Sequence, residues 1–146
     1  MSREIKPTSV LRDCTFEEND WNILARHWFP IAAATEVADR PLAARLLDIE
    51  LVLYRSGGKV VVARDLCPYR GMRLSCGCVD LDQIICPYHG LHFATHGRCS
   101  SIPSRPEARL SDRLSLTVLS SLERFGLIWA TLSGEPSRAR LYGRCN

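Results

Sequence analysis

Two short segments of the sequence repeat one arrangement of residue types that bind metals. Cys67-Pro68-Tyr69-Arg70-Gly71 and Cys86-Pro87-Tyr88-His89-Gly90 each place a cysteine, a proline and a ring-bearing residue ahead of a glycine. Thiolates bind soft metals such as iron or zinc, an imidazole completes the ligand shell, and glycine lets the backbone turn tightly. Two such loops that face each other can therefore hold a metal centre between them.

The spacing of these residues resembles the iron–sulfur signature of Rieske proteins, in which Cys-x-His is followed later by Cys-x-x-His. Here Cys67-x-Tyr69 is followed, after sixteen residues, by Cys86-x-x-His89. In a Rieske centre two cysteines bind one iron and two histidines bind the other, which raises the reduction potential. The resemblance implies a 2Fe-2S cluster with Cys67 and Cys86 as the cysteine ligands and His89 as the second histidine. Tyr69 stands at the position of the first histidine.

Flanking segments extend the resemblance to the amino-terminal domain of Rieske non-haem iron oxygenases, which include aromatic-ring hydroxylases and O- and N-demethylases. These segments are Trp28-Phe29-Pro30-Ile31, Arg73-Leu74-Ser75, Gly97-Arg98-Cys99 and Arg124-Phe125-Gly126-Leu127-Ile128-Trp129. The resemblance implies an all-β fold, a Rieske-type antiparallel β-sandwich with a small cluster-binding subdomain and a short N-terminal helix. It also implies that Pro103 covers the cluster and that backbone amides near Gly71 and Gly90 donate to its sulfurs.

Tyr69 leaves three interpretations open. A phenolate is a hard anionic ligand that suits ferric iron, but the metal must displace the phenol proton, so binding would be weaker and pH-dependent. Alternatively, another side chain substitutes for the missing histidine, the candidates being Cys76, Cys78, His92 and His96. In the third interpretation the site is degenerate and binds no cluster.

The chain has seven cysteines, an odd number, and four of them lie between Cys67 and Cys86 inclusive. In a chain that starts without a signal peptide, this favours metal or redox use over a framework of disulfides. A zinc site built from Cys67, Cys86, His89 and either Cys76 or Cys78 is a further alternative, because zinc accepts three sulfurs and one nitrogen. The spacing does not resemble that of zinc knuckles, however.

Length and composition are those of an ordinary globular protein. A chain of 146 residues predicts one domain with a buried core. The net charge of +3, with acidic and basic residues interleaved, argues against a nucleic-acid partner. No signal peptide or spanning segment is evident, so we expect a cytoplasmic protein without a membrane partner. Within 1–146 we expect a loose leader over 1–14, the cluster-binding subdomain over 65–104 and an irregular tail over 136–146.

A helix and two strands are expected ahead of the first loop. Thr15 and Glu18 are spaced as in a capping box, which predicts a short helix over about 16–26. Alternating apolar residues predict a half-buried strand over 47–53. After a turn at Ser56-Gly57-Gly58, a return strand over 60–63 then delivers Cys67 to its loop.

The second loop is expected between two further strands. A strand over 83–85 delivers Cys86, and beyond the loop Leu91 and Phe93 point inward while His92 points outward. Further strands are expected over 114–118 and 127–129, with a turn near Glu123-Arg124 between them. Many short strands at this spacing predict an antiparallel sandwich or barrel.

The expected function is one-electron transfer rather than chemistry on a substrate. Oxygenases of the family continue into a catalytic domain in which two histidines and a carboxylate bind iron, and no such set follows the Rieske-like part here. We therefore expect a ferredoxin-like component or detached amino-terminal domain of an oxygenase system, an electron carrier with His89 as the exit point. A reductase or ferredoxin would be the donor and a separate oxygenase catalytic subunit the acceptor. The alternative is a cluster-free interaction or regulatory subunit, or a truncated oxygenase remnant.

Overall fold

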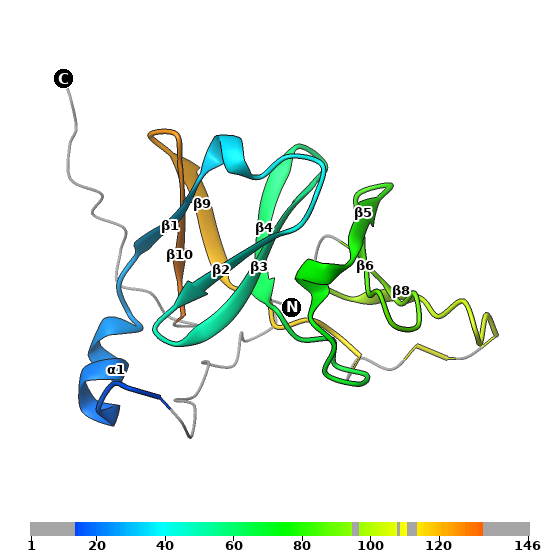
Figure 1. Ribbon diagram of the computed structural model, residues 1–146, viewed down its shortest axis with the longest axis horizontal. Coiled ribbons are helices and arrows are strands. Elements are labelled where there is room, and N and C mark those ends of the chain that lie inside the picture. The colour runs from blue at the N-terminus through cyan, green and yellow to red at the C-terminus, as the bar shows by residue number, and fades with distance from the viewer. Residues whose placement is uncertain (1–13, 95–96, 108, 111–113, 133–146) are drawn as a thin grey trace.

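The computed structural model describes residues 14–94, 97–107, 109–110 and 114–132. Within these ranges the chain forms a short α-helix, two 3-10 helices and ten strands in three antiparallel sheets (Figure 1). In chain order they are α1 (Glu18–Leu24), β1 (Phe29–Ala33), η1 (Ala34–Glu36), β2 (Leu42–Leu46), β3 (Ile49–Ser56), β4 (Lys59–Arg64), η2 (Leu74–Cys76), β5 (Cys78–Asp80), β6 (Gln83–Ile85), β7 (His92–Phe93), β8 (Cys99–Ser101), β9 (Ser120–Arg124) and β10 (Leu127–Thr131). The expected all-β class with a short N-terminal helix is confirmed.

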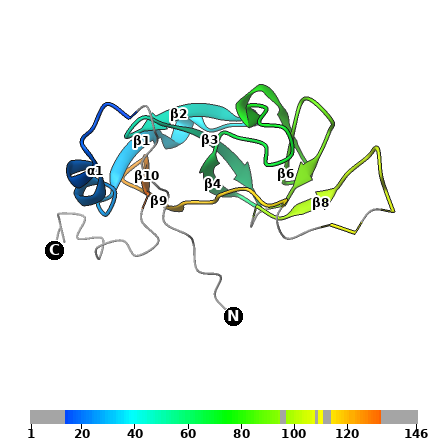
Figure 2. The same cartoon turned by 90° about the horizontal axis from the view of Figure 1, so that it is seen from below.

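The three sheets follow one another along the long axis of the molecule. Their strand orders are β1-β10-β9, β2-β3-β4 and β5-β6-β7-β8. The β2-β3-β4 sheet lies between the other two, with α1 at one end and the four-stranded sheet at the other (Figures 1 and 2). None of the helices in the described ranges is long and apolar enough to cross a membrane.

One core fills the space between the first two sheets and α1. Leu51, Leu53 and Val62 contribute from the β2-β3-β4 sheet, and Ile128 contributes from β10. Trp21 anchors α1 on this core, because its ring is buried and its indole N–H donates to the Leu47 carbonyl oxygen at 3.2 Å. Burial of large apolar side chains is the dominant stabilising contribution to such a fold.

A second core lies on the other face of β3 and includes the two loop cysteines. Val52 and Tyr54 point into it from β3, together with Phe93 from β7 and the thiols of Cys67 and Cys86. The strand expected to be half-buried is therefore buried on both faces, because the four-stranded sheet covers the side that alternation alone assigned to solvent. β3 thus contributes side chains to both cores, and the second of these cores contains the cysteines of the two loops.

Three local predictions were wrong. Leu47 and Asp48, expected inside a strand, form the turn of the β2–β3 hairpin with φ of 48° and 66°. Thr15 does not cap α1, whose N-cap is Glu17; its backbone N–H and hydroxyl donate instead to Asp48 Oδ2 at 2.8 and 2.5 Å. The segment 114–118 forms only isolated bridges, at Ser115 and Val118, rather than a strand.

Candidate metal centre

The two cysteine loops have the same backbone hydrogen bonds. In the first, Cys67 N–H donates to the Met72 carbonyl at 2.8 Å, and Gly71 N–H donates to the Cys67 carbonyl at 2.8 Å. In the second, Cys86 N–H donates to the Leu91 carbonyl at 2.9 Å, and Gly90 N–H donates to the Cys86 carbonyl at 3.1 Å. The sequence repeat is thus a structural repeat, and each loop presents its cysteine in the same way.

A glycine closes each loop because the backbone there is left-handed. The φ angles are 72° at Gly71 and 68° at Gly90, a conformation that other residues adopt only with strain. The N–H groups of both glycines are bonded within their own loops, while the N–H groups of Tyr69 and Arg70 lower the pKa of the Cys67 thiol. The glycines shape the loops, and a direct contact between their amides and cluster sulfurs stays a prediction.

The two cysteine thiols are buried side by side. Cys67 and Cys86 each expose only 2% of their surface. Burial raises the pKa of the Cys67 thiol, the N–H of Tyr69 partly offsets this, and the neighbouring Cys86 raises the pKa further. A metal that binds here therefore has to displace thiol protons, as metals generally do at cysteine ligands.

Tyr69 and His89 face each other at the tips of the loops. Their ring centroids are 5.4 Å apart and the rings are nearly perpendicular, at 88°. The ring of Tyr88 also contacts that of His89, with a centroid distance of 3.9 Å. Tyr69 thus lies across from the matched histidine, at the place where the resemblance puts a first histidine, and its ring does not turn away from the site.

The residues proposed as substitutes for that histidine are not placed as partners of His89. Cys76 and Cys78 are exposed on η2 and β5. His92 contacts Gln83 Oε1 through Nδ1 at 3.2 Å, on the outward side of β7, as expected. His96 lies outside the described residues. Among the candidates that the structure describes, Tyr69 is the side chain that faces His89.

A single-metal site of the zinc type is not assembled. Across the described residues, no three His, Cys, Asp or Glu side chains are grouped so as to hold one metal ion. Cys67, Cys86 and His89 therefore do not form a site for one ion with Cys76 or Cys78, both of which are exposed.

Pro103 packs over the second loop. A Cβ placed on Gly90 would lie 3.6 Å from Pro103 Cγ, which is an ordinary van der Waals contact. Leu66 has the corresponding position at the first loop, with its Cδ1 3.7 Å from a Cβ placed on Gly71. Each loop is thus backed by one apolar side chain, and the covering role of Pro103 toward a cofactor stays a prediction.

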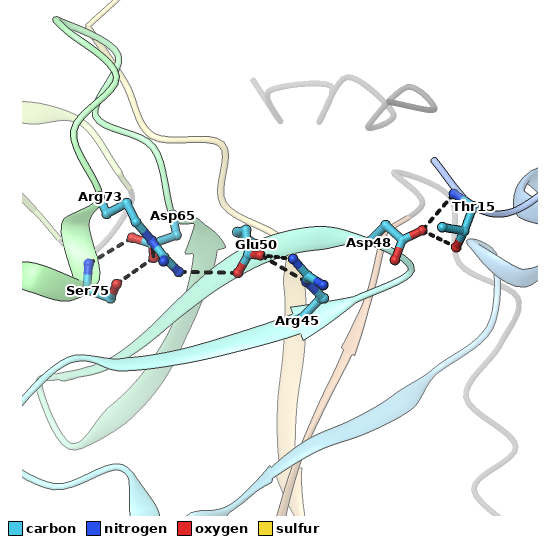
Figure 3. A network of polar contacts seen from close by, with 7 residues as sticks. All are labelled: Thr15, Arg45, Asp48, Glu50, Asp65, Arg73 and Ser75. Carbon is cyan, nitrogen blue, oxygen red and sulfur yellow. Dashed lines mark hydrogen bonds and ion pairs between the residues drawn. The ribbon is translucent and has the colours of Figure 1, made fainter. Parts of the chain in front are cut away.

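A buried carboxylate beside the first loop was not predicted as a site residue. Asp65 has a side chain with no exposed surface, and it accepts hydrogen bonds from Ser75 N–H at 2.8 Å, Ser75 Oγ at 2.5 Å and Arg73 Nε at 3.2 Å (Figure 3). Arg73 also contacts Glu50 at 3.2 Å, and Glu50 pairs with Arg45. The available signal in the sequence was an acidic residue two positions before Cys67.

The donor set fits a Rieske-type cluster at three of four positions. Two adjacent buried thiols suit one iron, and His89 supplies an imidazole at the more exposed edge. The fourth position holds a phenol, which is longer than an imidazole and must lose its proton to bind a metal. The thiol pair and the imidazole therefore match the donors of a Rieske-type cluster, whereas Tyr69 offers a phenol in place of an imidazole.

Comparisons with known proteins agree with this geometry. The family model of the Rieske 2Fe-2S domain matches residues 27–122. Methylxanthine N1-demethylase NdmA of Pseudomonas putida is 36% identical over 121 residues, covering 78% of this chain and 34% of that protein. Vanillate O-demethylase oxygenase subunit of Pseudomonas sp. (strain HR199 / DSM 7063) is 33% identical over 103 residues, covering 70% and 28%.

Solved structures give the same result at the level of the fold. The crystal structure of dicamba monooxygenase bound to dicamba superposes with a TM-score of 0.77 at 29% identity, covering 83% of this chain and 37% of that chain. The chain thus spans about a third of the length of these relatives. The chain belongs to the Rieske 2Fe-2S domain family and is homologous to the Rieske domain of oxygenases.

Proposed function

We propose that the chain carries single electrons through a Rieske-type 2Fe-2S cluster, as the Rieske component of an oxygenase system. Cys67 and Cys86 would bind one iron, and His89 with Tyr69 would lie at the other. When bound, such a cluster supplies a one-electron redox centre. The proposal is carried by the matching backbone hydrogen bonds of the two loops, together with their two buried cysteines and the contact between the rings of Tyr69 and His89.

The surface around the rings supports exchange of electrons with a partner protein. Four apolar or aromatic side chains at or beside the loop tips are exposed: Leu66, Tyr69, Met72 and Tyr88. Exposed apolar groups of this kind, close together on loops, are typical of protein contact sites. We propose a reductase or ferredoxin as donor and a separate oxygenase catalytic subunit as acceptor, with the edge of His89 as the exit. One of the relatives is the oxygenase subunit of vanillate O-demethylase, which is consistent with this assignment.

The second candidate is a cluster-free Rieske fold that acts through contacts alone. Tyr69 is the observation that favours it, because a phenol in place of the first imidazole weakens metal binding. In that case Tyr69, Tyr88 and Met72 would serve as a contact surface, and the paired thiols would be ordinary core residues.

Chemical analysis of the purified protein separates the two candidates. Anaerobically purified protein should contain two irons and two acid-labile sulfides per chain, the content of one such cluster, and its reduced form should give a Rieske-like EPR spectrum. Protein that holds neither iron nor sulfide, even after reconstitution with both under reducing conditions, would reject electron transfer and leave the contact role.

A further inference from the structure

The two ligand loops are closed at their bases by different means. The second loop lies between β6 and β7, whose antiparallel pairing of Ile85 with His92 closes the backbone directly below it. The first loop follows β4 and leads into η2, a 3-10 helix, so no strand pairing closes the backbone below it. Apart from the Cys67–Met72 hydrogen bond, the first loop therefore needs another contact to hold its two ends together.

The side chain of Asp65 makes that contact. Asp65 precedes the first loop, while Arg73 and Ser75, which donate to its carboxylate, follow it (Figure 3). The backbone N–H of Asp65 is itself fixed to the Glu50 carbonyl of β3 at 3.0 Å. A fully buried carboxylate is costly unless its oxygens are hydrogen-bonded, and this one receives a main-chain N–H, a hydroxyl and a guanidinium N–H.

We propose that Asp65 is the positioning residue of the first ligand loop. Its carboxylate joins the chain before Cys67 to the chain after Met72 and takes the place of the strand pairing that closes the second loop. It thereby fixes Cys67 beside Cys86 and Tyr69 opposite His89. The effect of Asp65 on a bound cluster rests on the proposed function. The effect of Asp65 on the conformation of the first loop is independent of that function.

The chain offers a matched control in Asp48. This carboxylate also accepts the backbone N–H and the hydroxyl of one residue, Thr15, but it lies at the opposite end of the same row of polar contacts, away from the loops (Figure 3). Asp65→Asn keeps the size of the side chain but removes its charge and turns two donors toward Arg73 and Ser75. Ser75→Ala is the milder variant, because it removes one hydroxyl and leaves the carboxylate bonded to two donors.

The first measurement is amide hydrogen exchange in the metal-free full-length protein. Asp65→Asn should accelerate exchange of the Gly71 N–H by about tenfold or more, since a charge-assisted clamp is lost, and leave that of Gly90 unchanged. Ser75→Ala should give a smaller effect in the same direction, and Asp48→Asn should affect neither amide. Equal acceleration at Gly71 and Gly90, or none at either, would overturn the proposal.

The second measurement concerns the loaded protein. Iron loss to a chelator should be faster in Asp65→Asn than in Val62→Ala, a variant of the main core used to match the loss of thermal stability. Equal rates in the two variants would mean that Asp65 acts through general stability alone and would contradict positioning. If the wild type never binds iron, the proposed function fails, and the exchange rates at Gly71 and Gly90 still decide the role of Asp65.

Discussion

Replacing Tyr54 by phenylalanine is expected to stabilise the protein. Tyr54 is fully buried in the core that contains Cys67 and Cys86, and its hydroxyl has no hydrogen-bond partner among the described residues. A buried polar group without a partner costs about 1–3 kcal/mol. Removing it while keeping the ring should therefore raise the free energy of unfolding by about 1 kcal/mol at neutral pH, since some of the gain is lost to imperfect packing.

The same hydroxyl should make stability depend on pH in the alkaline range. Burial raises the pKa of Tyr54 to about 12 from its ordinary value of 10.0. As the pH rises, the hydroxyl ionises in the unfolded chain before it ionises in the folded chain. The contribution of neutral Tyr54 to the free energy of unfolding is therefore fully present below about pH 10 and is lost as the pH rises toward 12. A pKa shift of this size corresponds to a loss of about 3 kcal/mol when complete, of which about 1 kcal/mol should be present at pH 10.5.

Urea unfolding of both proteins at pH 7, 9 and 10.5 measures these quantities. The difference between Tyr54→Phe and the wild type should be constant up to pH 9 and should widen at pH 10.5, because other titrating groups are common to both. Tyr88→Phe, at an exposed tyrosine, serves as the control and should follow the wild type. A difference that does not widen with pH, or a Tyr54→Phe protein less stable than the wild type, would refute a buried hydroxyl without a partner.

Three further predictions concern the loops and the segment that follows the first of them. Tyr69→His should increase the iron retained after purification, because it restores a neutral imidazole opposite His89; unchanged iron content would contradict this. His89→Ala should abolish a Rieske-like EPR spectrum, and a spectrum that survives would place the ligands elsewhere. Gly77→Ala should lower the free energy of unfolding by about 1–3 kcal/mol, since its Cβ would lie 2.0 Å from the Ile85 carbonyl oxygen, and an unchanged urea midpoint would argue against that close contact.

Sequence reasoning was most successful where the residue pattern was local. The loop repeat, the Gly57-Gly58 hairpin and the inward positions of Leu91 and Phe93 depend on neighbouring residues, and the structure confirms them. The fold class followed from the same short strands and from the family resemblance. These features are set by backbone sterics and by side-chain periodicity, which a sequence displays directly.

The predictions that were wrong concerned an unusual local turn and contacts between residues distant in sequence. Leu47-Asp48 forms a hairpin turn with both residues at positive φ, although an apolar residue followed by aspartate is not the usual signal for such a turn. Thr15 donates to Asp48 rather than capping α1, because the folded chain brings that carboxylate within reach. Asp65 was overlooked for the same reason, since nothing local shows that Arg73 and Ser75 return to it.

The structure also bears on what the tyrosine changes in the site. If the site had lost its constraints together with its histidine, the first loop would have no reason to match the second in hydrogen bonding. It does match, and Tyr69 still faces His89 at 5.4 Å. The tyrosine therefore changes the chemistry of the side chain at this position and leaves the backbone hydrogen bonds of the loop the same as those of the second loop. For that reason a single substitution, Tyr69→His, should suffice to strengthen cluster binding without any change to the loops around it.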